Sequence, residues 1–181
     1  MPSQYIGSGR LYIKKQGASS FTEVGLIQDI SLNVSTDKAE LMDYKSGVGV
    51  VTAMAITKQT YTLQFTTADI SPEILAMAFF SDVTTLSGGT LPQQGQEGYI
   101  NGATAIALIK ANSKSLMWTG EIKIEEVPVQ GAKGIFYFPN VQLSMDGDMS
   151  LMGNEYRKIT FTANCGLDDN GHAFKLYKQT A

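Results

Sequence analysis

Residues Lys58–Ser81 read KQTYTLQFTTADISPEILAMAFFS, and the hydrophobic period changes in the middle of this stretch. In its first half Tyr61, Leu63 and Phe65 alternate with threonine and glutamine side chains. A period of two is typical of a half-buried strand.

The second half of the stretch has the features of a short helix. Ser71 can cap a helix start, Pro72 suits the first helical position, and Glu73 lies where the helix dipole favours an anion. One helical face would then gather Ile74, Leu75, Ala78 and Phe79, with Met77 beside them. Because this is the only convincing helix pattern in the chain, we expect its apolar face to pack on a sheet.

The segment that precedes this strand is expected to form a long hairpin arm. Residues Leu26–Ser35 alternate as a strand, and Thr36–Ala55 then carries several charges, two glycines and a further group of apolar side chains. An arm of this length is unusual within one compact domain. We expect it to be loose in isolation and ordered against a neighbouring copy. Its candidate inter-subunit residues are Asp43, Tyr44, Val48, Val50, Val51 and Met54.

The remainder of the chain is also rich in strands. Strands are expected near Arg10–Lys14, Ala103–Lys110, Met117–Val127, Ile135–Phe138, Val141–Met145, Tyr156–Cys165 and Phe174–Leu176. Pro139 is expected to separate two of them, Gly131–Gly134 and Asn170–Gly171 to form turns, and Ser87–Gly98 to be a loop. The predicted fold is one domain over residues 1–181, mainly β, an antiparallel β-sandwich or partial barrel with one flanking α-helix.

Four of these strands carry neutral polar side chains on the face opposite their apolar residues. A solvated outer face usually includes more charge. Such a face could line a wet channel or meet another copy, or the threonines could simply reflect strand propensity. If this face lines a channel, the candidate channel residues are Ser31, Asn33, Thr60, Thr62, Gln64 and Thr66.

Composition limits the classes of function. Of 181 residues 14 are Lys or Arg and 17 are Asp or Glu, which gives a net charge of −3. The absence of a basic cluster argues against tight binding to nucleic acid. The sequence shows neither a secretory signal nor an apolar run long enough to anchor the chain in a membrane. The single cysteine, Cys165, is expected to be a small buried side chain in a strand.

No motif indicates enzymatic chemistry, a metal or a cofactor. His172 is the only histidine, so neither a catalytic triad nor a metal cluster can be assembled around it. The stretch Asp146–Ser150 resembles the start of a calcium loop, but Leu151 stands where the turn glycine belongs. We expect Glu121 and Glu125, which share a strand face, to be solvated. The chain is therefore expected not to be an enzyme.

The order of these parts resembles that of a known family. The segments YIGSGRLYI, GLIQDISLNV followed by AELMDYKSG, KQTYTLQFTTADISPEILAMAFF and IFYFPNVQLSMDGDMSLMGNEYRKITFTANCGLDDNG are similar to the tail tube (major tail) protein of long-tailed bacteriophages. The resemblance covers nearly the whole chain and implies two packed sheets flanked by a helix. It also implies a virion protein, assembled in the host cytoplasm, whose hexameric rings stack into a hollow tube.

The resemblance further implies partners. They are other copies of the chain and the tape-measure, tail-terminator and baseplate or tip proteins of the tail. The genome would pass through the lumen to the host without specific binding, since phosphate contacts need basic groups. Two alternatives stay open: a tube protein like that of type VI secretion, and a β-sandwich receptor-binding module that presents the loop Ser87–Gly98.

Overall fold

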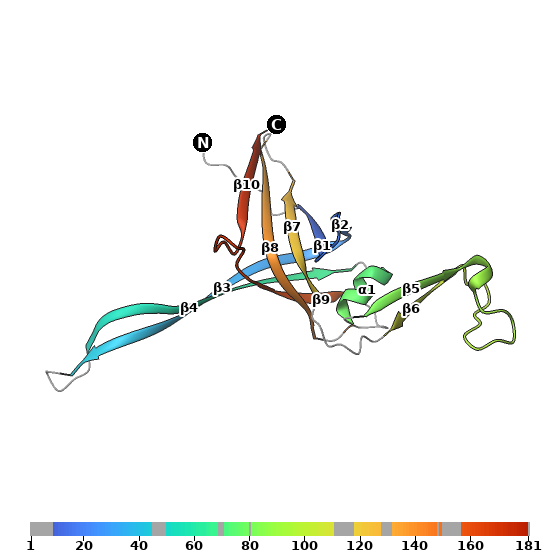
Figure 1. The fold of residues 1–181 in the computed structure, drawn as a ribbon, viewed down its shortest axis with the longest axis horizontal. Coiled ribbons are helices and arrows are strands. Elements are labelled where there is room, and N and C mark those ends of the chain that lie inside the picture. The colour runs from blue at the N-terminus through green and yellow to red at the C-terminus, as the bar shows by residue number, and fades with distance from the viewer. Residues whose placement is uncertain are drawn as a thin grey trace.

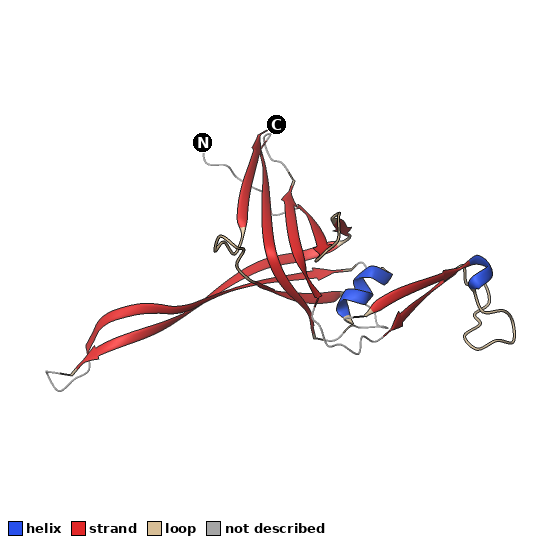
Figure 2. Cartoon of the chain, viewed as in Figure 1, coloured by secondary structure: helices blue, strands red, loops and turns tan. Residues whose placement is uncertain are grey.

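The computed structural model describes residues 9–44, 50–68, 71–79, 81–110, 118–127, 132–147, 149 and 157–180. The fold is mainly β, antiparallel and sandwich-like, with one α-helix in this described part, so the predicted fold class is confirmed (Figures 1 and 2). The strands are β1 (Gly9–Lys15), β2 (Thr22–Val24), β3 (Ile27–Asp43), β4 (Val50–Thr67), β5 (Asp82–Ser87), β6 (Ala105–Lys110), β7 (Trp118–Glu126), β8 (Ala132–Asp146), β9 (Ile159–Cys165) and β10 (Lys175–Thr180). The helix is α1 (Pro72–Ala78), and a 3-10 turn, η1 (Gly88–Thr90), follows β5.

One large sheet folds over itself to enclose the core. Its strands run in the order β2-β1-β7-β8-β9-β4-β3, and β10 pairs with β8. The first half of β8 pairs with β10 and the second half with β9, while β7 pairs along both halves. Figure 1 shows β7, β8 and β10 running across the direction of β3, β4 and β9. The apolar faces of these two groups of strands therefore meet, and β8 is the corner between them.

A β-bulge at Pro139 makes this corner possible. Gly120 of β7 pairs with Val141, and Ile122 pairs with Phe138, so two residues of β8 stand opposite one residue of β7. A bulge tolerates proline because no ladder hydrogen bond is needed there, and it bends the strand. The predicted break at Pro139 and the predicted turn at Gly131–Gly134 are both wrong, because β8 runs without interruption from Ala132 to Asp146.

The core confirms the alternation read from the sequence. Leu63 and Phe65 of β4 are buried, and Phe65 stacks on Phe161 of β9 with ring centroids 5.2 Å apart. Further buried positions on β1, β7, β8 and β9 are Leu11, Ile13, Ile122, Phe138, Val141, Leu143, Ile159 and Ala163.

The helix begins where the sequence predicts. The Ser71 side chain accepts a hydrogen bond from the Ile74 backbone N–H, and Pro72 occupies the first helical turn. Ile74, Met77 and Ala78 are buried, and the helix contacts β5, β6 and β8. Phe79 was expected on the buried face, but it is the C-cap residue, its backbone leaves the helix there, and its side chain is exposed.

Two hairpins extend from this core in opposite directions (Figure 1). Strands β3 and β4 stay paired from Ile27 and Thr67 out to Asp43 and Val50. We call residues 36–44 and 50–59 of this hairpin the arm. Paired strands thus lie where the sequence predicted an arm at 36–55, and its ordering against a neighbouring copy stays a prediction. The second hairpin joins β5 to β6, and β5 was not predicted, because its alternation covers only a few residues.

The C-terminal strand pairs differently from the expectation. A turn forms at Asn170–Gly171, where Gly171 has a φ of 79° and the Asp168 carboxylate accepts hydrogen bonds from the backbone N–H groups of Asn170 and His172. The strand that follows pairs with β8 and not with β9, so this turn does not close the expected hairpin. His172 is exposed, as predicted.

Candidate functional site

The predicted channel residues lie together on one face of the sheet. Ser31 pairs with Gln64 and Asn33 with Thr62 across β3 and β4, and cross-strand partners share a face. On β4 the side chains at 60, 62, 64 and 66 point away from the buried row of Leu63 and Phe65. The structure therefore brings together all six residues that the sequence assigned to this face.

The face continues onto two strands that the six-residue assignment left out. Thr62 and Gln64 pair with Asn164 and Thr162 of β9, which in turn pair with Gln142 and Ser144 of β8. We call the combined surface the polar face; its members are Asp29, Ser31, Asn33, Ser35, Thr60, Thr62, Gln64, Thr66, Gln142, Ser144, Asp146, Thr160, Thr162 and Asn164. The alternation of Thr160, Thr162 and Asn164 was visible in the sequence, but only strand pairing shows that they adjoin β4.

Hydrogen bonds between side chains connect the strands of the polar face. Gln64 donates to Asp146 at 3.1 Å, Thr162 donates to the same carboxylate at 3.3 Å, and the hydroxyl oxygens of Thr66 and Thr160 lie 3.0 Å apart. The face contains two carboxylates and no lysine or arginine. The nearest basic residues on the same side, Lys58 and Lys158, lie beyond its two ends. The polar face is therefore a polar surface without positively charged side chains.

The opposite group of strands has a very different outer face. Lys14 pairs with Glu121 at 2.7 Å, Lys123 pairs with Glu125 at 2.7 Å, and Tyr137 donates to Glu121 at 2.6 Å. Burial, followed by the hydrogen bond to Glu121, raises the pKa of Tyr137 to about 12. Hydrogen bonds from Lys123 and Lys133 lower the pKa of Glu125. Neutral polarity is thus a property of one face of this protein and not of its whole surface.

The arm carries the second set of predicted site residues. Tyr44, Val51 and Met54 are exposed apolar side chains, and Met54 pairs with Glu40 across the hairpin. Asp43 and Val50 are backbone partners at the end of the described hairpin, and Val48 lies outside the described residues. The exposed apolar set also includes residues that the assignment missed, namely Leu41, Met42 and Ile56. Their place on the arm became evident only from the pairing, since both strands extend further than their alternation suggested.

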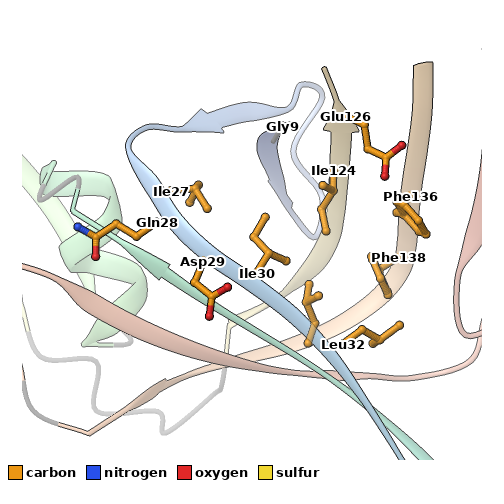
Figure 3. Close-up of a pocket in the computed structure, with 11 residues that line it drawn as sticks. Gly9, Ile27, Gln28, Asp29, Ile30, Leu32, Ile124, Glu126, Phe136 and Phe138 are labelled. Atoms are coloured by element: carbon orange, nitrogen blue, oxygen red, sulfur yellow. The ribbon is translucent and has the colours of Figure 1, made fainter. Parts of the chain in front are cut away.

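An open cavity lies at the base of the arm, between β3 and the strands β7 and β8. It has a volume of about 440 Å³. Figure 3 shows Ile27, Ile30, Ile124, Phe136 and Phe138 arranged round a common space. Glu126 also lines the cavity and forms no ion pair within the described part of the chain. Asp29 is a lining residue too, but it pairs with Thr66 of β4 and so belongs to the polar face. No pattern in the sequence indicated this cavity.

Among the described residues no group of three histidine, cysteine or acidic side chains could hold a metal ion. Cys165 is half-buried, and burial raises the pKa of its thiol to about 11. This is the opposite of the shift that activates a nucleophilic cysteine. No helix among the described residues has the length and apolar character needed to cross a membrane.

Comparison with known proteins gives a family without an assigned role. The model of a family described as "Protein of unknown function UCP028589" matches residues 4–133, which includes the arm, α1 and the second hairpin. No curated protein matches the chain.

Proposed function

The chain belongs to this family of proteins of unknown function, and we propose that it is a structural subunit that assembles with copies of itself into a hollow tube. The observation that carries the proposal is the arm. It extends far from the core and exposes Leu41, Met54 and Ile56, each about two-thirds accessible to solvent (65%, 64% and 67%). Met54 and Ile56 lie on one side of the hairpin with Val51 and Met42, and Leu41 lies on the other side. An exposed apolar surface such as the first of these marks a site of protein association.

The polar face supports the tubular form of the assembly. It adjoins the arm on the same two strands, β3 and β4, so subunits joined through their arms would bring their polar faces next to one another. Strands from successive subunits could then line a continuous channel. A lining without lysine or arginine would let a polyanion such as DNA slide, because it offers no phosphate contacts.

The order of the sequence segments supports a more specific form of the proposal. It resembles the tail tube protein of long-tailed bacteriophages, so the tube would consist of stacked hexameric rings that conduct the phage genome into the host. Its partners would be its own copies and the tape-measure, terminator and baseplate or tip proteins of the tail.

A second candidate function rests on the β5–β6 hairpin. This hairpin holds the loop after η1 away from the core, where Tyr99 and Ile100 are exposed. A receptor-binding module would present such a loop to a ligand and would not need to polymerise.

The size of the purified protein separates the two functions. We expect light scattering to show growth with concentration, and negative-stain microscopy to show rings or tubes with a central channel. A compact monomer at high protein concentration, with no rings or tubes on the grid, would refute the tube and favour the binding module.

A further inference from the structure

The arm and the cavity present complementary surfaces on one molecule. On one side of the arm the β4 strand carries Ile56, Met54 and Val51, which are exposed, and Met42 of β3 pairs with Val51. The cavity is an open hollow whose lining is mainly isoleucine, leucine and phenylalanine (Figure 3). The first is an exposed apolar projection, and the second is an open apolar hollow.

These two surfaces cannot meet within one chain. Ile30 and Leu32 of β3 line the cavity, and the same strand continues outward as the arm. Because β3 and β4 remain paired out to Asp43 and Val50, the hairpin extends away from the core (Figure 1). It therefore cannot fold back into the cavity of its own chain. A projection that fits a hollow elsewhere on an identical molecule makes a head-to-tail contact, which produces closed rings or open filaments.

Charge is compatible with this contact. Lys38 lies on the same side of the arm as Ile56, its cross-strand partner, and forms no ion pair within the described residues. Glu126 at the cavity likewise forms no ion pair among the described residues. With the apolar β4 row inside the cavity, the β3 row, which also contains Glu40, would stay at the rim, where Lys38 can reach a carboxylate.

We propose that the arm of one copy inserts its β4 row, Ile56, Met54 and Val51, into the cavity between β3 and β7–β8 of the next copy. This inference rests on the proposed function, since it names the surface that the arm of a tube subunit contacts. It makes the interface heterologous: every subunit gives one arm and receives another.

Two substitutions test the two sides of the proposed interface, the arm and the cavity, separately. Met54→Asp disables the arm and leaves the cavity intact. Leu32→Asp places a charge at the cavity, at a position already 37% exposed, and leaves the arm intact. Each variant alone is expected to associate at least about tenfold more weakly than the native protein, since a charge replaces a side chain that the contact would bury. An equimolar mixture should form 1:1 complexes, because the intact arm of one variant fits the intact cavity of the other.

Sedimentation velocity of the native protein, of each variant and of the mixture tests the inference. Leu108→Asp, on β6 away from both surfaces, is the matched control and should associate like the native protein. Melting curves identify a variant that fails to fold. If a variant fails to fold, the substitutions Glu126→Lys and Lys38→Glu are used instead. Each of them alone should weaken association, and the double variant, in which the two charges are exchanged, should restore it.

The outcomes distinguish this inference from the proposed function. If the native protein assembles and the folded Leu32→Asp variant assembles equally well, arm-in-cavity docking is refuted, but the proposed tube is not. A mixture of folded variants that stays monomeric overturns the docking as well, as does a small apolar molecule found in the cavity of the assembled protein by native mass spectrometry. A native protein that never assembles overturns both.

Discussion

Replacing Met54 and Ile56, two exposed apolar residues on the same side of the arm, should abolish assembly without affecting the fold. Met54 and Ile56 are 64% and 67% exposed, so about two-thirds of each side chain is still available for burial in an interface. Complete burial of such a side chain stabilises by about 1.5–3 kcal/mol, and two-thirds of it by about 1–2 kcal/mol. The double substitution Met54→Ser, Ile56→Ser therefore removes about 2–4 kcal/mol from each arm contact, which corresponds to roughly 30- to 1,000-fold in its dissociation constant.

The isolated subunit should be nearly unaffected by the same change. Substitutions at exposed positions usually alter the free energy of unfolding by less than about 0.5 kcal/mol. Leu176→Ser on β10 is the matched control, because Leu176 is 61% exposed but lies away from the arm. We expect light scattering to show assemblies for the native protein and the control but monomers for the double variant, with closely similar melting temperatures.

Two results would refute this reasoning. If the double variant assembles at the native concentration, the arm does not carry the contact. If its melting temperature falls by many degrees, the arm is part of the folding core, and the loss of assembly would have another cause.

Three further predictions concern the core, the C-terminal turn and the polar face. Phe161→Ala should lower the free energy of unfolding by about 3–5 kcal/mol, since Phe161 is fully buried and stacks on Phe65; a urea titration that shows less than about 1 kcal/mol would contradict the described core. The hydrogen bond from Lys175 and those from the backbone N–H groups of His172 and Asn170 hold the pKa of Asp168 well below its usual range, so its contribution to stability is present above its unfolded pKa of about 3.9 and is lost as the pH falls toward its folded pKa. Asp168→Asn should therefore be less stable than the native protein at neutral pH, with a difference that shrinks in acid; melting temperatures that stay equally far apart down to about pH 2 would show that the carboxylate charge is unimportant. Thr62→Lys places a lysine in the middle of the polar face. If this face lines a tube, the assembled variant should bind DNA at low salt and release it at high salt, so genome ejection should be slower at low salt than at high salt. Normal ejection at low salt from intact tails would show that the polar face does not line the channel.

The sequence determined those features that depend on neighbours along the chain. The start of α1 follows from Ser71 and Pro72, because capping and a preset φ act within one helical turn. The inward rows of β4, β7 and β9 follow from alternation, since successive side chains of a strand point to opposite faces. The arm was recognisable as a hairpin, and the six channel candidates were correctly placed on one face because they lie on two strands that pair in register.

The tertiary structure alone decided which strands lie side by side. Alternation does not show that Thr162 adjoins Gln64, that β10 pairs with β8, or that the cavity opens between β3 and β7–β8, because these contacts join residues far apart in the chain. Pro139 is an example of the same limit. Its ring forbids an ordinary ladder hydrogen bond, so the local sequence indicates a break, whereas pairing with β7 on one side accommodates it as a bulge and keeps β8 continuous. Strand order and register depend on how all the apolar side chains of the chain are buried together. A local sequence pattern therefore cannot predict them.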